Sequence, residues 1–121
     1  FVGVDPDSAK RFYFLPGGAI EPGETEVACG KREAMEETGY KVRIEAESKL
    51  TKKYFFSWNK RVYDCTTHFY RGYLDEVFHP PKAIFDSDYN KGAVWIPVAK
   101  IPTIFEYMPE IVQAAEKLSH S

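Results

Sequence analysis

The sequence predicts a single α+β domain, spanning residues 1–121, in which an antiparallel or mixed β-sheet packs against helices. Three observations predict this class. Residues 26–38 form a helical stretch between two cap residues, two long alternating stretches flank a turn at 59–60, and the chain closes with an amphipathic stripe. Strands and helices follow each other in mixed order, without an internal repeat or a linker.

The first elements are marked by their end signals. Residues 11–15, Arg-Phe-Tyr-Phe-Leu, predict a short strand that ends at Pro16, and residues 18–24 predict a loop. Thr25 is suited to cap the amino end of a helix over residues 26–38. Gly39 is suited to end this helix in a left-handed conformation.

The remaining elements alternate between strands and loops before a final helix. We expect strands at residues 42–44, 52–58, 61–74 and 93–98, with a loop over residues 79–92. Asn59 and Lys60 predict a tight turn between two of these strands. Pro109 fits the first turn of the closing helix. Its apolar stripe is expected to pack in the core and comprises Met108, Ile111, Val112, Ala115 and Leu118.

Composition limits the class of partner. The net charge of −2 gives no basic excess for binding long nucleic acid, whereas a small phosphorylated ligand remains compatible if a cation neutralises it. No apolar run reaches the length of about 18 residues that spans a membrane. Cys29 and Cys65 are expected to be reduced thiols. We expect a cytoplasmic protein, and the start at Phe1 suggests that some N-terminal residues are missing.

Three glutamates share one face of the predicted helix. Glu33, Glu36 and Glu37 are spaced i, i+3 and i+4, so that at about 100° per residue they lie in one narrow sector. Like charges this close repel each other, and a hard cation such as Mg²⁺ or Mn²⁺ would remove the repulsion. The alternative is an acidic, solvent-exposed face with ion pairs to Lys31 or Arg32.

The loop before the helix favours the cation. Gly17 and Gly18 allow the backbone to approach a ligand closely and to present a carbonyl oxygen. Glu24 lies at a spacing from which it can reach Arg32, two turns along the helix. A guanidinium bonded to carboxylates would fix their orientation.

The stretch from Gly18 to Tyr40 resembles the Nudix box, Gly-x5-Glu-x7-Arg-Glu-U-x-Glu-Glu-x-Gly-U, where U is a bulky aliphatic residue. All seven fixed positions match over these 23 residues, namely Gly18, Glu24, Arg32, Glu33, Glu36, Glu37 and Gly39. Ala34 and Tyr40 occupy the two U positions, which we interpret as a repacked core. The run Leu15-Pro16-Gly17-Gly18 at the start of the box and the later Trp95-Ile96-Pro97 also look like the family.

The resemblance implies an α/β/α sandwich with a mixed sheet between helices. It also implies hydrolysis of a nucleoside diphosphate linked to a group X, by a metal-activated water that attacks phosphorus. Glu33, Glu36 and Glu37, with a carbonyl of Gly17 or Gly18, would bind Mg²⁺ or Mn²⁺. Glu24 and Arg32 would orient this set. The general base would be Glu33 or an acid of the later loop, where the candidates are Glu76, Asp86 and Asp88.

The sequence indicates the substrate less directly than it indicates the metal site. Tyr54 and Trp58 are candidates to stack on a base, and Asp86 and Asp88 are candidates to contact the substrate. A nucleoside triphosphate is the default by resemblance. Dinucleoside polyphosphates, nucleotide sugars and 5′-triphosphate RNA are alternatives. Two other classes stay open, a catalytically inactive nucleotide- or RNA-binding module and a protein-interaction domain, and a homodimer is an open alternative to a monomer.

Overall fold

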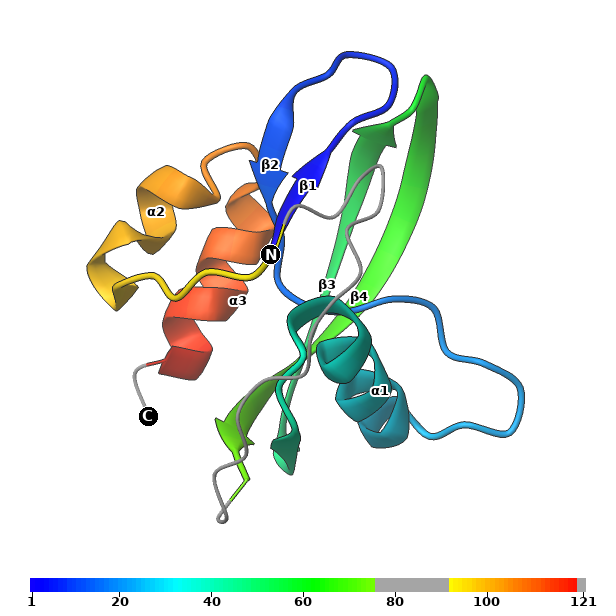
Figure 1. Cartoon of the computed structure of the whole chain (residues 1–121), viewed down its shortest axis with the longest axis vertical. Helices are drawn as coiled ribbons and strands as arrows, with labels where there is room; N and C mark the ends of the chain where they lie inside the picture. Colours follow the sequence, from blue (N-terminus) through cyan, green and yellow to red (C-terminus); the bar gives the residue numbers. More distant parts are fainter. Residues whose placement is uncertain (76–91, 120–121) are drawn as a thin grey trace.

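A computed structural model describes residues 1–75 and 92–119, with only the backbone of Val2 and Val4 (Figure 1). Its strands pair in two antiparallel hairpins, β1 with β2 and β3 with β4. The elements, in chain order, are β1 (Val2–Val4), β2 (Arg11–Tyr13), α1 (Glu26–Thr38), β3 (Val42–Trp58), β4 (Arg61–Leu74), the 3-10 helix η1 (Val98–Lys100), α2 (Ile101–Ile104) and α3 (Pro109–Ser119). The predicted α+β class is confirmed.

Helix α1 has the predicted bounds because local cap chemistry sets both of its ends. The hydroxyl of Thr25 accepts a hydrogen bond from the N–H of Ala28 at 3.1 Å. Gly39 adopts a left-handed conformation with φ 79°, and its N–H donates to the carbonyl of Met35 at 3.0 Å. Both caps satisfy backbone groups that a helix leaves without partners at its ends.

Replacing Gly39 with alanine is expected to destabilise the fold by about 1–2 kcal/mol, because a Cβ is strained in the left-handed region. Denaturant unfolding measures this as a lower midpoint with an unchanged slope. Gly72→Ala is the matched control, since a Cβ there would lie 3.7 Å from the carbonyl of Arg43, an ordinary contact. Equal midpoints for the two variants would contradict the role of Gly39.

The long hairpin of β3 and β4 is the main sheet. Asn59 and Lys60 form its turn with φ values of 48° and 67°, which suit the twist of a two-residue hairpin and confirm the predicted turn. The prediction of two separate strands at 42–44 and 52–58 was wrong, because both belong to the single strand β3. The register shifts between Glu45 and Leu50, and the hydroxyl of Ser48 accepts the N–H of Arg71 at 2.7 Å across this irregularity.

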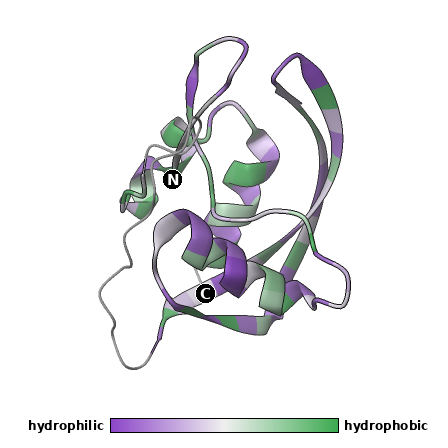
Figure 2. Ribbon diagram, turned by 45° about the vertical axis from the view of Figure 1, so that its right-hand side comes forward, coloured by the Kyte–Doolittle hydropathy of each residue, from purple (hydrophilic) through white to green (hydrophobic). Residues whose placement is uncertain are grey.

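Helices cover both faces of the long hairpin (Figure 1). On one face α1 approaches closely, since a Cβ added to Gly30 would lie 2.6 Å from Cδ1 of Ile44. On the other face α2, α3 and the segment between them bury the core, which comprises Phe69, Ile101, Phe105, Met108, Ile111 and Ala114. Hydrophobic and hydrophilic bands alternate along the hairpin, as the strand pattern predicts (Figure 2).

Two predicted strands differ from the structure. The strand expected at 11–15 is β2, which ends at Tyr13. Residues 93–98 form no strand within the described part of the chain: Ile96 packs against the core, but Trp95 is 72% exposed and its indole N–H donates to the hydroxyl of Tyr40 at 3.1 Å. An apolar run becomes a strand only where a neighbouring strand offers hydrogen bonds. No helix in the described ranges could cross a bilayer.

Candidate active site

Arg32 is the centre of the polar cluster on α1. Its Nε and Nη2 donate to the two carboxylate oxygens of Glu24 at 2.8 and 3.0 Å, a bidentate pair. Its Nη1 donates to Glu33 at 2.8 Å and to Glu36 at 3.2 Å. The guanidinium therefore joins three carboxylates, and it holds the pKa of Glu24 at about 2, chiefly by hydrogen bonding.

Glu37 is the buried carboxylate of α1. It is only 7% exposed, and one of its oxygens accepts the N–H of Gly17 at 2.7 Å. Burial raises the pKa of Glu37 to about 7, against the lowering effect of the Gly17 N–H, and the nearby charge of Glu33 adds to the rise. A carboxylate that loses water in this way is suited to a cation or a proton.

The glycine loop presses against the same helix. A Cβ added to Gly18 would lie 2.5 Å from a carboxylate oxygen of Glu33, so only glycine fits at this position without a shift. The carbonyl oxygens of Gly18 and Ala19 each accept a weak hydrogen bond from the buried thiol of Cys29 at 3.6 Å. The loop therefore brings backbone groups and carboxylates together, as the sequence predicts.

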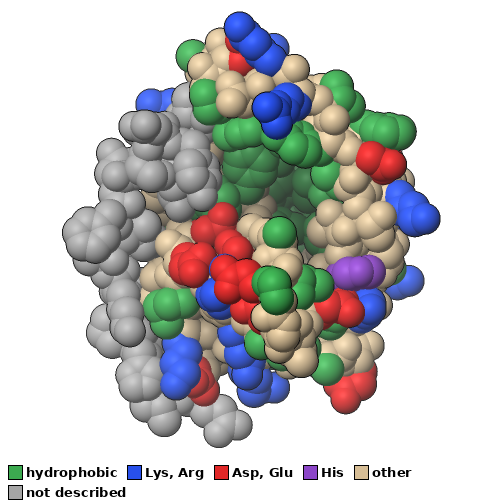
Figure 3. All heavy atoms as spheres, turned by 90° about the vertical axis from the view of Figure 1, so that its right-hand side faces the viewer, with side chains coloured by type: hydrophobic (Ala, Val, Ile, Leu, Met, Phe, Trp, Pro, Cys, Tyr) green, Lys and Arg blue, Asp and Glu red, His purple; other side chains and the backbone are tan. Residues whose placement is uncertain are grey.

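Glu33, Glu36 and Glu37 are called the acidic face of α1. Figure 3 shows acidic side chains gathered beside a hollow with hydrophobic walls. Within residues 1–75 and 92–119, no three carboxylate, histidine or cysteine side chains converge closely enough to hold a metal ion. Arg32 lies between Glu33 and Glu36 and neutralises them in this state. A cation would have to replace some of these arginine contacts.

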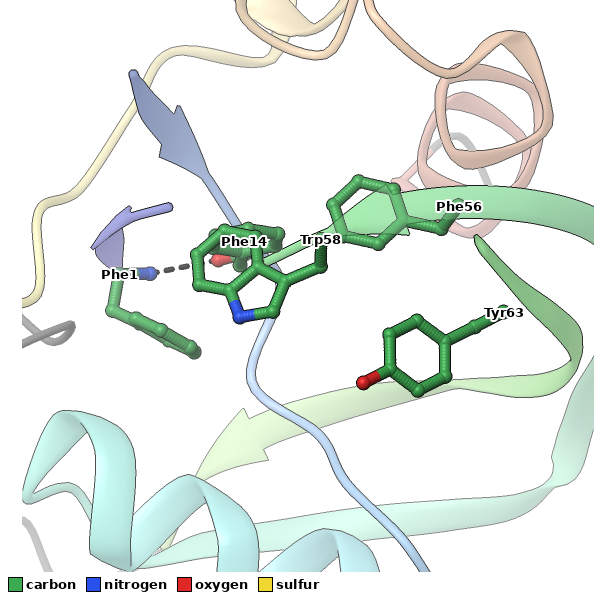
Figure 4. Close-up of a pocket in the computed structure, with 5 residues that line it drawn as sticks. All are labelled: Phe1, Phe14, Phe56, Trp58 and Tyr63. Carbon is green, nitrogen blue, oxygen red and sulfur yellow. Dashed lines mark hydrogen bonds between the residues drawn. The ribbon is translucent and has the colours of Figure 1, made fainter. Parts of the chain in front are cut away.

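An aromatic pocket of about 330 Å³ is lined by Phe1, Phe14, Phe56, Trp58 and Tyr63 (Figure 4). The rings of Phe14 and Trp58 meet edge to face, with centroids 5.4 Å apart, and Phe56 stacks with Trp58 at 6.1 Å. The pocket joins the two hairpins, since Phe1 precedes β1, Phe14 follows β2, and the other three residues lie on β3 and β4.

Comparison with known proteins agrees with this geometry. A family model described as the NUDIX domain matches residues 5–116, which is most of the chain. The chain belongs to the Nudix family. A search of curated proteins found no match. The match to the family covers β2, the acidic face, the long hairpin and most of α3, far beyond the box itself.

The Nudix domain brings together most of the predicted box residues. Glu24, Glu33 and Glu36 converge on Arg32, and Gly17 bonds to Glu37, here through its N–H. A glycine carbonyl as a metal ligand stays a prediction. So do the metal-binding roles of the acidic face.

The predicted substrate contacts have different outcomes. Trp58 lines the aromatic pocket. Tyr54 does not line it: the ring packs against the core and the hydroxyl is hydrogen-bonded to Thr67 at 2.8 Å. Contact of Tyr54 with the substrate stays a prediction. Asp86 and Asp88, like the candidate base Glu76, lie outside the described residues.

Sequence reasoning missed Phe1 and Phe14 as pocket residues. A signal was present, because Phe12 and Phe14 alternate on one side of the first predicted strand, where an apolar face must meet another apolar surface. In the structure Phe12 packs on Tyr107 with ring centroids 5.0 Å apart, and Phe14 packs on Trp58. The partners come from distant parts of the chain, so the sequence did not identify them.

The raised pKa of Glu37 predicts how the metal-free Nudix domain responds to pH. Below about pH 4.5 this carboxyl is protonated in both folded and unfolded chains. Between pH 4.5 and about 7 the folded state binds more protons, so the free energy of unfolding falls as pH rises. Thermal unfolding in chelator should therefore give melting temperatures that decrease from pH 5 to 8.

Glu37→Gln isolates this effect, because glutamine keeps the shape and cannot ionise. The gain in melting temperature of the variant over the wild type should grow from pH 5 to pH 8. Glu24 does not interfere, because its pKa of about 2 lies below this window. A difference between variant and wild type that stays constant with pH would show that Glu37 keeps an ordinary pKa.

Proposed function

We propose that this Nudix domain is a metal-dependent pyrophosphohydrolase that acts on a nucleoside triphosphate or a related nucleoside diphosphate derivative. The observation that carries the proposal is the acidic face of α1, with the buried carboxylate of Glu37 fixed against the glycine loop by the N–H of Gly17. A buried, oriented carboxylate of this kind is costly as an anion unless it takes up a proton or binds a cation, and such perturbed groups gather at functional sites.

The donor set fits a hard cation. Glu33, Glu36 and Glu37 supply only oxygen ligands from one rigid element, as Mg²⁺ and Mn²⁺ prefer, and a carbonyl of Gly17 or Gly18 would complete the set. The fit requires Arg32 to release Glu33 or Glu36, which is feasible because the Glu36 side chain is 56% exposed. When bound, such a cation neutralises the diphosphate and lowers the pKa of a coordinated water.

The chain's own residues would then position the carboxylates and deprotonate the attacking water. Arg32, anchored to Glu24 by two hydrogen bonds, would keep the remaining carboxylate in place. Glu33 is our candidate to take the proton of the attacking water, and an acid of the later loop is the alternative. Glu37 would hold the cation in its ionised form, since a proton and a cation compete for the same oxygens.

A second candidate function has one observation in its favour. The salt bridges of Arg32 already neutralise Glu33 and Glu36, so that the helix is satisfied without a cation. A nucleotide- or RNA-binding module that no longer turns over would keep this arrangement. A hydrolase would exchange it when metal and substrate bind.

A screen of substrates distinguishes the two candidates. Nucleoside triphosphates, nucleotide sugars, dinucleoside polyphosphates and 5′-triphosphate RNA are incubated with Mg²⁺ or Mn²⁺, and the released phosphate, pyrophosphate and nucleotide are separated chromatographically. The pyrophosphohydrolase predicts cleavage of at least one class that stops in chelator. Nucleotide binding by calorimetry, without cleavage under either metal, would support the binding module instead. Size-exclusion chromatography of the same sample decides between monomer and homodimer.

A further inference from the structure

The walls of the aromatic pocket are unusual in their chemistry. The five residues that line it, among those that the structure describes, are all aromatic, and none of these five carries a charged side chain or an amide. The side-chain polar atoms are the indole nitrogen of Trp58 and the hydroxyl of Tyr63, and neither is buried without a partner. The hydroxyl can remain in water, because Tyr63 is 44% exposed.

We infer that this pocket holds the nucleobase by stacking and does not read its hydrogen-bonding edge, so that the enzyme selects substrates by ring size more than by base identity. The inference rests on the proposed function and deepens it. A base has a π-face whatever its edge, and stacking is therefore tolerant of sequence. Strong selection for one base needs polar groups that pair with its edge, and the described residues of this wall offer few.

The pocket lies within reach of the acidic face. Phe14 is in its wall, and Gly17, three residues later, donates its N–H to Glu37. Three residues span at most about 11 Å. A ribose and its first phosphoryl group separate a base from the scissile link by a distance of this order.

The size and arrangement of the pocket fit one ring system. Its volume of about 330 Å³ is at the small end of the range of ligand pockets, about 300–1,000 Å³. Figure 4 shows Phe1 and Tyr63 on either side of the space beside Trp58. A base in this space would contact the Trp58 ring, which also packs against Phe14 and Phe56. The ribose and the phosphates would extend toward α1.

The first experiment tests the stacking surface. Trp58→Ala should lower kcat/KM about 5- to 150-fold for every base, mainly through KM, as expected for the loss of one stacking contact. Trp58→Phe should restore most of this loss, and Tyr63→Ala, at an exposed position, provides a second test in case Trp58→Ala unfolds. Phe55→Ala is the matched control, because this aromatic on the same strand faces outward and is 69% exposed.

The second experiment tests read-out of the base. ATP, GTP, CTP and UTP should give kcat/KM values within about ten-fold of each other, with higher values for the purines. A site that hydrogen-bonds the edge of one base would instead discriminate against the others by as much as about 10⁴-fold. Tyr63→Phe should leave this order unchanged. Ribose 5-triphosphate, which has no base, should lose as much as Trp58→Ala does. A preference of more than about 100-fold for one base, or unchanged kinetics in both Trp58→Ala and Tyr63→Ala, would overturn the inference.

A failure of the proposed function can be distinguished from a failure of the stacking inference. If the wild type cleaves none of these compounds, the hydrolase proposal fails, and binding of ADP and CDP with Mg²⁺ is measured by calorimetry. Weaker binding to Trp58→Ala than to Phe55→Ala would still support the stacking pocket. Equal binding to the two variants, or no binding to the wild type, would overturn it.

Discussion

Replacement of Glu37 with glutamine is expected to lower kcat about a thousand-fold while the domain stays folded. Glu37 is the most buried carboxylate of the acidic face, and its orientation is set by the N–H of Gly17, which glutamine can still accept. The variant loses the negative charge that would bind the cation. Metal-derived stabilisation of a phosphoryl transition state is worth several kcal/mol, and about 1.4 kcal/mol corresponds to ten-fold in rate.

Single-turnover and steady-state assays with saturating Mg²⁺ and nucleotide measure this loss, and circular dichroism checks the fold. Glu26→Gln is the matched control, because Glu26 is on the same helix but bonds to Lys49 and Tyr70, away from the acidic face. The control should retain kcat. Full turnover by Glu37→Gln with saturating metal and substrate would show that the carboxylate has no role in the reaction.

Replacement of Arg32 with alanine is expected to lower kcat/KM about 10- to 100-fold, the usual effect of losing a residue that orients metal ligands. The guanidinium joins Glu24, Glu33 and Glu36 through four of its hydrogen bonds, and without it these carboxylates repel each other. Arg32→Lys should recover only part of the activity, because an ammonium cannot form the bidentate pair with Glu24.

The same variant also distinguishes an arginine that orients the carboxylates from one that competes with the cation. Lys31→Ala, an exposed cation on the same helix, is the control and should behave like the wild type. If Arg32 orients the carboxylates, Arg32→Ala lowers turnover, and titration with Mn²⁺ shows a lower affinity for the cation. A gain in Mn²⁺ affinity together with a gain in turnover would instead mean that Arg32 competes with the cation and holds the site closed.

Much of the fold follows from local sequence. The bounds of α1 and the turn at Asn59 and Lys60 were predicted correctly, because caps and left-handed residues act within a few positions of the chain. The long strands were predicted less well. An irregularity between Glu45 and Leu50 interrupts the alternation, so that β3 looked like two strands although its pairing with β4 continues across it.

The sequence by itself determined the family, the helix with its acidic face and the residues that can bond to Arg32, since all of these depend on spacing along one element. Only the tertiary structure decided which carboxylate is buried, because the desolvation of Glu37 depends on the loop at Gly17 and on the elements packed around it. The same holds for the aromatic pocket, where Phe14 meets Trp58 across 44 residues of chain. Burial and the pairing of distant surfaces are properties of the packed molecule, and no local pattern encodes them.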